Sequence, residues 1–134
     1  LKKRIFSKSK SKKIKLLNED STSIHTLNKI KKICGKYNSI LIHLDSNHTK
    51  DHVLKELNLY SELLKKNNYI VVGDTIIQNI PKQKHRKREW SKGNNPMNAV
   101  NEFLKKNNKF KIDKHINFKQ LLTNNPNGYL KRIK

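Results

Sequence analysis

Two short apolar segments, each ending on an aspartate, set the fold that this chain can adopt. The first runs from Ser39 to Asp45 and the second from Tyr69 to Asp74, and a segment long enough for a helix separates them. Short, nearly continuous apolar runs rich in β-branched residues are typical of strands covered on both faces, as in parallel sheets between helices. Since a helix joins such strands, this order predicts an α/β fold.

The two aspartates follow the predicted strands at the place where α/β proteins bind ligands. Parallel strands end at one edge of the sheet, and ligands bind just beyond that edge. Aspartate is also common at strand ends because its side chain supports turns. A role in a turn explains either Asp45 or Asp74 alone, but it explains less easily why both predicted strands end on an aspartate. We therefore predict a functional site that contains both.

Composition limits the class of protein. The chain has 134 residues, enough for one domain, and its 31 Lys and Arg against 10 Asp and Glu give a net charge of +21, which favours attraction to polyanions. The single cysteine, Cys34, excludes an internal disulfide and a metal site made of several cysteines. No apolar run approaches the roughly 20 residues of a membrane span, and no signal-peptide stretch opens the chain. A soluble cytoplasmic protein is expected.

The remaining pattern predicts alternating strands and helices. We expect a basic segment at 1–13, adjacent parallel strands at 14–17, 40–45 and 69–74, and helices at about 23–34, 50–65 and 96–106. The second helix would bury Val53, Leu57, Tyr60 and Leu64, and the third would begin at the Asn95-Pro96 cap. Later strands are expected at 110–112 and, as a hairpin, at 120–122 and 129–130.

Two further features leave alternatives open. The run 82–90 is the densest basic stretch and contains the only tryptophan, Trp90. Three interpretations of this run are open: it binds nucleic acid through phosphate contacts and base stacking, it forms a lid over the site, or it is a solvated loop. His48 lies three residues past Asp45 and fits either a general base or a loop histidine bonded to the backbone.

Four motifs, in order and with compatible spacing, resemble those of a known family. They are Asp45-Ser46-Asn47-His48, Val71-Val72-Gly73-Asp74-Thr75, the segment 93–104 around Asn95-Pro96, and the segment 125–132 around Asn127-Gly128. From about residue 16 to 132 the chain resembles the cephalosporin hydroxylase/rhamnosyl O-methyltransferase family. The resemblance implies an S-adenosylmethionine-dependent O-methyltransferase with a Rossmann-like sheet. It also implies a small-molecule or glycan hydroxyl as acceptor and a divalent cation, Mg²⁺, near that hydroxyl.

The resemblance also assigns residues. Asp45 and Asp74 fall on metal positions of the family, whose usual Glu before the second Asp is replaced here by Gly73. Asp45 and His48 take the catalytic role, with His48 as auxiliary base. Ser21 and Asp45 fall near the cofactor, although acidic residues replace the small residues that usually precede Ser21.

One expected part of such an enzyme has no counterpart in the sequence. Class I methyltransferases hold the cofactor with a Gly-rich turn after the first strand, and the four glycines here form no such turn. We therefore expect a partial Rossmann-like sheet, mostly parallel with an antiparallel C-terminal edge, from a domain at 14–134 that lacks its first strands. The exposed sheet edge would favour self-association, and cofactor binding by this chain alone would be weak. The alternative function is a basic nucleic-acid-binding module on a Rossmann-like core.

Overall fold

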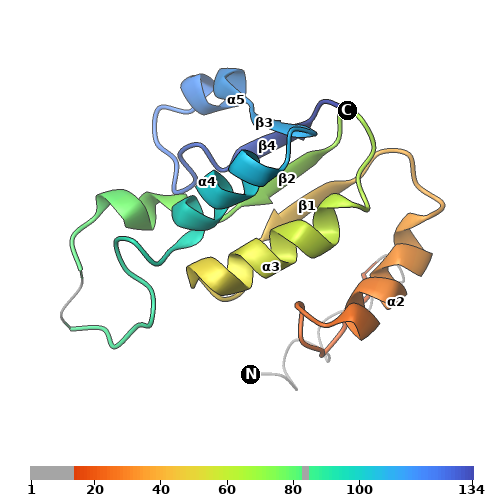
Figure 1. Ribbon diagram of the computed structural model, residues 1–134, viewed down its shortest axis with the longest axis horizontal. Helices are drawn as coiled ribbons and strands as arrows, with labels where there is room; N and C mark the ends of the chain where they lie inside the picture. The colour runs from red at the N-terminus through yellow and green to blue at the C-terminus, as the bar shows by residue number, and fades with distance from the viewer. Residues whose placement is uncertain (1–13, 83–84) are drawn as a thin grey trace.

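The computed structural model describes residues 14–82 and 85–134, which form a four-stranded sheet with helices packed on it (Figure 1). The elements in chain order are α2 (Ile24–Cys34), β1 (Leu41–Leu44), α3 (Lys50–Ser61), β2 (Tyr69–Val72), the 3₁₀ helix η1 (Thr75–Asn79), α4 (Pro96–Lys106), β3 (Phe110–Ile112), α5 (Lys114–Lys119) and β4 (Tyr129–Arg132). The predicted basic segment 1–13 lies outside the described residues. Within them, no helix is long and apolar enough to span a membrane.

The sheet has the order β1-β2-β4-β3. The predicted parallel pairing of the two aspartate-ending strands is confirmed, with Leu44 opposite Val72. Strand β4 pairs antiparallel with β2 on one side and with β3 on the other. The predicted antiparallel C-terminal edge is therefore present, but among the described residues only one of the three strand pairings is parallel, so the sheet is mixed and not mostly parallel as predicted.

The core lies between the sheet and the pair α3 and α4, which run side by side across one face (Figure 1). The predicted apolar stripe of the second helix is confirmed, because all four of its members are buried (Val53, Leu57, Tyr60 and Leu64). Helix α3 itself ends at Ser61, earlier than predicted, and a turn carries Leu64 into the core. Helix α4 begins as predicted, since Asn95 accepts hydrogen bonds from the backbone N–H groups of Met97 and Asn98.

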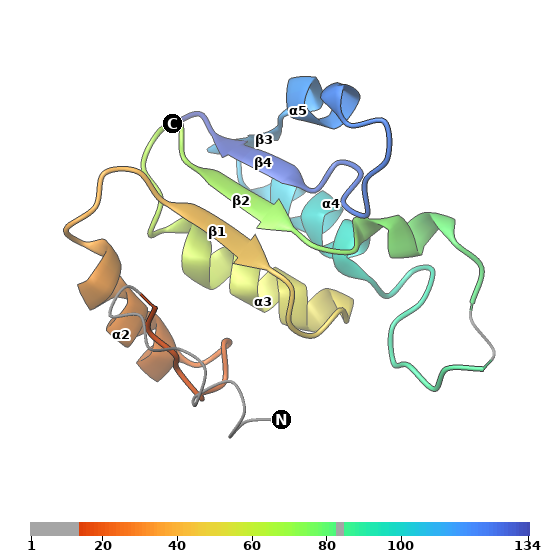
Figure 2. The ribbon, with the colours of Figure 1, turned by 180° about the vertical axis from the view of Figure 1, so that it is seen from behind.

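The opposite face of β1 and β2 has no helix in front of it when the molecule is seen from behind (Figure 2). Leu41 on β1 is 69% exposed, so the expectation of strands covered on both faces is wrong for the described residues. The reason is the direction of the chain. Right-handed crossovers that advance the same way along a sheet place successive helices on the same face, here α3 and α4.

Two predicted strands are wrong. Residues 14–17 form no strand, and Ile14, Leu16 and Leu17 are exposed, because no described strand lies beside them. Residues 120–122 form none either, and Leu121 and Leu122 are almost fully exposed. β4 already has a neighbour on each side, which leaves no edge for a hairpin partner.

The unpredicted helix α5 is fixed to the sheet by one carboxylate. Asp113 accepts hydrogen bonds from the backbone N–H groups of His115 and Ile116, and so caps the helix. Its other oxygen accepts a hydrogen bond of 2.7 Å from the Tyr69 hydroxyl on β2. This bond raises the pKa of Tyr69 to about 12 and, together with the capping bonds, lowers the pKa of Asp113.

We expect the Asp113→Asn substitution to bring the Tyr69 pKa back toward its ordinary value of 10.0. The raised pKa means that the fold favours the neutral phenol. Its contribution to stability is therefore complete below pH 10 and is lost as the pH rises through about 12. The lowered pKa of Asp113 gives a contribution that is present above its ordinary value of 3.8 and is lost as the pH falls through the folded-state value.

Phenolate absorbance of the wild type, with that of Tyr69→Phe subtracted, measures this titration. Asp51→Asn is the matched control, because it removes an exposed carboxylate at the start of α3. An unchanged Tyr69 midpoint in Asp113→Asn would contradict the assignment.

Candidate functional site

Three predicted site residues come together at one edge of the sheet. Asp45 and Asp74 follow the paired strands β1 and β2, and His48 lies in the loop after β1. One ligand atom from each of the three lies within 4.8 Å of the others. The His48 Nε2 atom is 3.4 Å from Asp45 Oδ1 and 3.2 Å from Asp74 Oδ2. We call these three residues the Asp-His-Asp cluster.

Asp74 is held by the loop that precedes β4. Its backbone is left-handed, with φ of 52°, a conformation that non-glycine residues seldom adopt. The Asp74 N–H donates to the Asn125 side-chain oxygen at 2.9 Å, and the Thr75 hydroxyl donates to the Pro126 carbonyl at 2.8 Å. Backbone strain of this kind persists where the surroundings fix it, and it is common at functional sites. The 125–128 motif thus supports Asp74, a role that its sequence alone did not reveal.

The position of Asp45 depends on Gly73. A Cβ atom at Gly73 would lie 2.8 Å from Asp45 Oδ1 and 3.0 Å from the Leu44 carbonyl oxygen. The Asp45 carboxylate therefore uses space that any larger residue at position 73 would take. The Asp45 side chain is 55% exposed and that of Asp74 39%, so the carboxylates face solvent while His48 lies behind them.

His48 is covered by Trp90, which belongs to the basic run 82–90 (the basic loop). The Trp90 ring lies against the imidazole, with 5.1 Å between centroids, and the Arg88 guanidinium lies 5.4 Å from the Trp90 centroid. Within the described ranges, His48 Nδ1 and the Trp90 indole nitrogen are buried without a hydrogen-bond partner, and His48 Nε2, also buried, lies near the two carboxylates without forming a hydrogen bond to them. Leaving such atoms unpaired costs about 1–3 kcal/mol each, so this arrangement is poor as structural packing and suits a site that binds something.

The donor set of the cluster fits a divalent cation. Ligands at about 2.1 Å from an octahedral cation are about 3 Å apart when adjacent, close to the 3.2 and 3.4 Å separations here. Carboxylate oxygens suit both Mg²⁺ and Mn²⁺, and Mn²⁺, as a transition metal, accepts an imidazole nitrogen more readily than Mg²⁺ does. The cluster therefore fits Mg²⁺ through its two aspartates and Mn²⁺ through all three residues.

A second group of polar side chains lies on the other side of Asp45. The predicted cofactor residues Ser21 and Asp45 both line a groove of about 460 Å³ between α2 and β1. Glu56 also lines this groove, although it is only 2% exposed, and it accepts a hydrogen bond of 2.8 Å from the Ser46 hydroxyl. His52 Nε2 lies 3.3 Å from the Ser21 hydroxyl and 3.4 Å from Glu56 Oε1. His52 and Glu56 were not predicted as site residues, and their i, i+4 spacing after the Asp45 loop is the signal that could have indicated them.

Comparison with known proteins agrees with the geometry. The sequence matches the family described as Rhamnosyl O-methyltransferase/CmcI over residues 2–133. No curated protein and no solved structure matched the chain. Since the match covers nearly all 134 residues, the chain belongs to the rhamnosyl O-methyltransferase/CmcI family of S-adenosylmethionine-dependent O-methyltransferases.

Proposed function

We propose that this chain activates the acceptor hydroxyl in a metal-assisted, S-adenosylmethionine-dependent O-methyl transfer to a small molecule or glycan. The observation that carries the proposal is the Asp-His-Asp cluster at the carboxyl ends of β1 and β2. Ligands of α/β folds bind at this edge. In this proposal β1 and β2 belong to a Rossmann-like sheet, whose antiparallel C-terminal edge is formed by β4 and β3.

Asp45 and Asp74 would hold the cation through their exposed carboxylates. A cation there would lower the pKa of the acceptor hydroxyl and orient it toward the methyl donor. His48 was predicted as an auxiliary base, but both of its ring nitrogens are buried, and Nε2 faces the two carboxylates that would hold the cation. We therefore assign His48 Nε2 as a third donor to the cation. Asp45, the most exposed member of the cluster, faces the acceptor.

The cofactor would lie on the groove side of Asp45. Ser21 and Asp45 both line this groove, which agrees with their predicted contact to S-adenosylmethionine. The two sides of Asp45 thus support two roles for it, one toward the methyl donor and one toward the activated hydroxyl.

The test is a Mn²⁺ titration followed by the fluorescence of Trp90, the only tryptophan and the ring packed on His48. We expect saturable quenching by this paramagnetic ion, with Mn²⁺ bound more tightly than Mg²⁺ because of the imidazole. Asp45→Asn should weaken Mn²⁺ binding by about tenfold or more, since one of the two charged ligands is lost.

Asp51→Asn again serves as the control, because Asp51 is an exposed acid on α3 that is not part of the cluster. Its Mn²⁺ affinity should equal that of the wild type. Quenching that does not saturate, or that Asp45→Asn leaves unchanged, would refute the metal site.

A further inference from the structure

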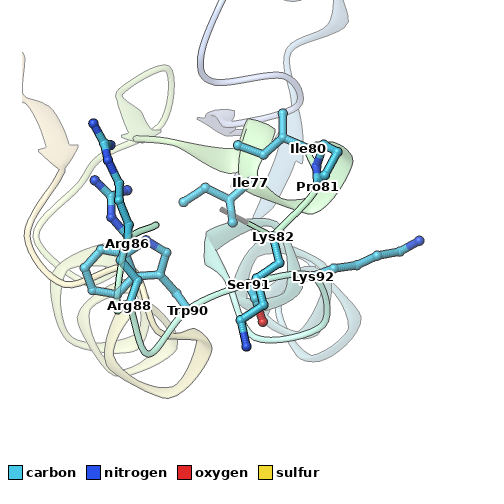
Figure 3. A pocket seen from close by; sticks show the side chains of 9 residues that line it. All are labelled: Ile77, Ile80, Pro81, Lys82, Arg86, Arg88, Trp90, Ser91 and Lys92. Carbon is cyan, nitrogen blue, oxygen red and sulfur yellow. The ribbon is translucent and has the colours of Figure 1, made fainter. Parts of the chain in front are cut away.

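Residues of the basic run 82–90 line a pocket (Figure 3), and one of them, Trp90, also lies against His48 of the cluster. We propose that this pocket binds a carboxylate on the acceptor, so that the substrate class is a hydroxyl compound with an apolar body and a carboxylate group. The inference rests on the proposed function, because it specifies what the same site would accept. We call the pocket the carboxylate pocket; its lining residues are Ile77, Ile80, Pro81, Lys82, Arg86, Arg88, Trp90, Ser91 and Lys92.

The carboxylate pocket has an apolar side and a cationic side. Figure 3 shows Ile77, Ile80 and Pro81 together, and the arginine side chains beside the Trp90 ring. The free volume is about 40 Å³, and a single water needs roughly 10–15 Å³ of such space. The pocket therefore holds a small group such as a carboxylate, with the rest of the ligand outside it.

The cationic side of the carboxylate pocket is not neutralised by acidic residues in its own lining. Four of its lining residues are lysine or arginine and none is acidic. Across the described residues, no salt bridge engages any of these four cations. The planar guanidinium groups of Arg86 and Arg88 suit two parallel hydrogen bonds to a carboxylate, whereas the Lys92 chain extends away from them (Figure 3). We therefore assign anion binding mainly to the two arginines.

Trp90 joins the carboxylate pocket to the Asp-His-Asp cluster. It lines the pocket and also lies against His48, with 5.1 Å between the ring centroids. A ligand whose carboxylate is held at Arg86 and Arg88 would lay its body along Trp90, with its hydroxyl near the cluster. The carboxylate and the reacting hydroxyl should then be separated by about the width of one aromatic ring.

The loop that carries the carboxylate pocket is fastened to both neighbouring elements. The Gly93 N–H and the Asn95 side-chain amide donate to Gln78 Oε1, at 3.1 and 2.7 Å, which ties the loop to η1. The Lys50 N–H donates to Asn94 Oδ1 at 2.9 Å, which ties it to the start of α3. Fixing these contacts before binding lowers the entropy lost when a ligand is held next to the cluster.

An extended nucleic acid fits the carboxylate pocket less well. A phosphate backbone would contact the exposed cations, but it would gain nothing from the apolar side formed by Ile77, Ile80 and Pro81. A small free volume whose apolar side is made of two isoleucines and a proline suits one functional group attached to an apolar body. The test must therefore distinguish binding of a nucleic acid from binding of a carboxylate ligand.

The probe is 3,4-dihydroxybenzoate, titrated in metal-free buffer and followed by Trp90 fluorescence. Catechol, which has the same hydroxyls without the carboxylate, is the comparison ligand. We expect 3,4-dihydroxybenzoate to bind at least about tenfold more tightly than catechol, a ratio typical of one charged bidentate contact. The double variant Arg86→Gln/Arg88→Gln should lose about the same factor.

The matched control is Lys87→Gln/Lys105→Gln, which removes the same charge at exposed residues that do not line the pocket. Its affinity for the probe should stay within about twofold of the wild type, since long-range screening leaves little effect. An equal loss in the control, equal binding of catechol, or no saturable response would overturn the inference. So would tight binding of a DNA oligonucleotide where 3,4-dihydroxybenzoate gives no response. Because no metal is present, failure here leaves the Mn²⁺ test of the proposed function intact.

Discussion

Replacing Gly128 by alanine is expected to destabilise the fold by about 3 kcal/mol, a large part of the roughly 5–15 kcal/mol that holds a domain together. A Cβ atom at this position would lie 2.4 Å from the Val72 carbonyl oxygen and 3.1 Å from that of Asn125. Both are backbone atoms, so neither can turn aside. The Gly128 carbonyl also accepts the Val72 N–H at 2.8 Å, and separating the two chains would break that bond. The clash of the added Cβ atom can therefore be relieved only if the end of β2 moves away from the loop before β4.

Urea denaturation of Gly128→Ala measures this loss, and Gly35→Ala is the control. At Gly35 a Cβ atom would meet only the Lys31 carbonyl at 3.3 Å, and the right-handed backbone there accepts alanine. The control should stay within about 1 kcal/mol of the wild type. Because the same loop holds Asp74 through Asn125, Gly128→Ala should also weaken Mn²⁺ binding. A wild-type midpoint for Gly128→Ala would contradict the contact between β2 and this loop.

The parts of the fold that could be predicted from the sequence are those set by local pattern. The apolar runs before Asp45 and Asp74, with a helix between them, determine a parallel pair through the handedness of the crossover. The helix at Asn95-Pro96 was predictable because cap and proline act on neighbouring residues. The predicted site followed from the same pattern, since strands in register bring their terminal aspartates together.

The parts that could not be predicted depend on contacts between distant segments. β4 lies between β2 and β3 because Leu130, which is fully buried, fills the core there. A hairpin with residues 120–122 looked favourable only because those residues are near in sequence. Two contacts in the site come from loops whose positions the local sequence pattern does not predict. They are the packing of Trp90 on His48 and the hydrogen bond from the Asp74 N–H to the Asn125 side chain.

Gly73→Glu and Gly73→Ala are expected to change metal binding in opposite directions. The resemblance to the family implies a glutamate at this position, so Gly73→Glu supplies a third carboxylate. The Cβ atom of the glutamate would crowd Asp45 Oδ1 just as that of alanine does, but the added carboxylate more than offsets that loss, so the Mg²⁺ affinity should rise severalfold, because Mg²⁺ prefers oxygen donors. Gly73→Ala adds only a methyl group, which would lie 2.8 Å from Asp45 Oδ1 and push that carboxylate out of the cluster. We expect it to weaken Mn²⁺ binding severalfold, since one of the two charged ligands is displaced.

The two variants form a matched pair, because both place a Cβ atom 2.8 Å from Asp45 Oδ1 and 3.0 Å from the Leu44 carbonyl, and only one adds an oxygen ligand. Gly73 does not have a left-handed backbone, so neither substitution is strained for that reason. Quenching of Trp90 by Mn²⁺, with Mg²⁺ as competitor, gives both affinities in one experiment. If both variants weakened the binding of both metals alike, a carboxylate at 73 would not reach the cation, and the glycine would serve only to make room for Asp45. A Mg²⁺ gain confined to Gly73→Glu would instead show that a carboxylate at position 73 reaches the cation, so that the site can hold a third carboxylate although this chain has glycine there.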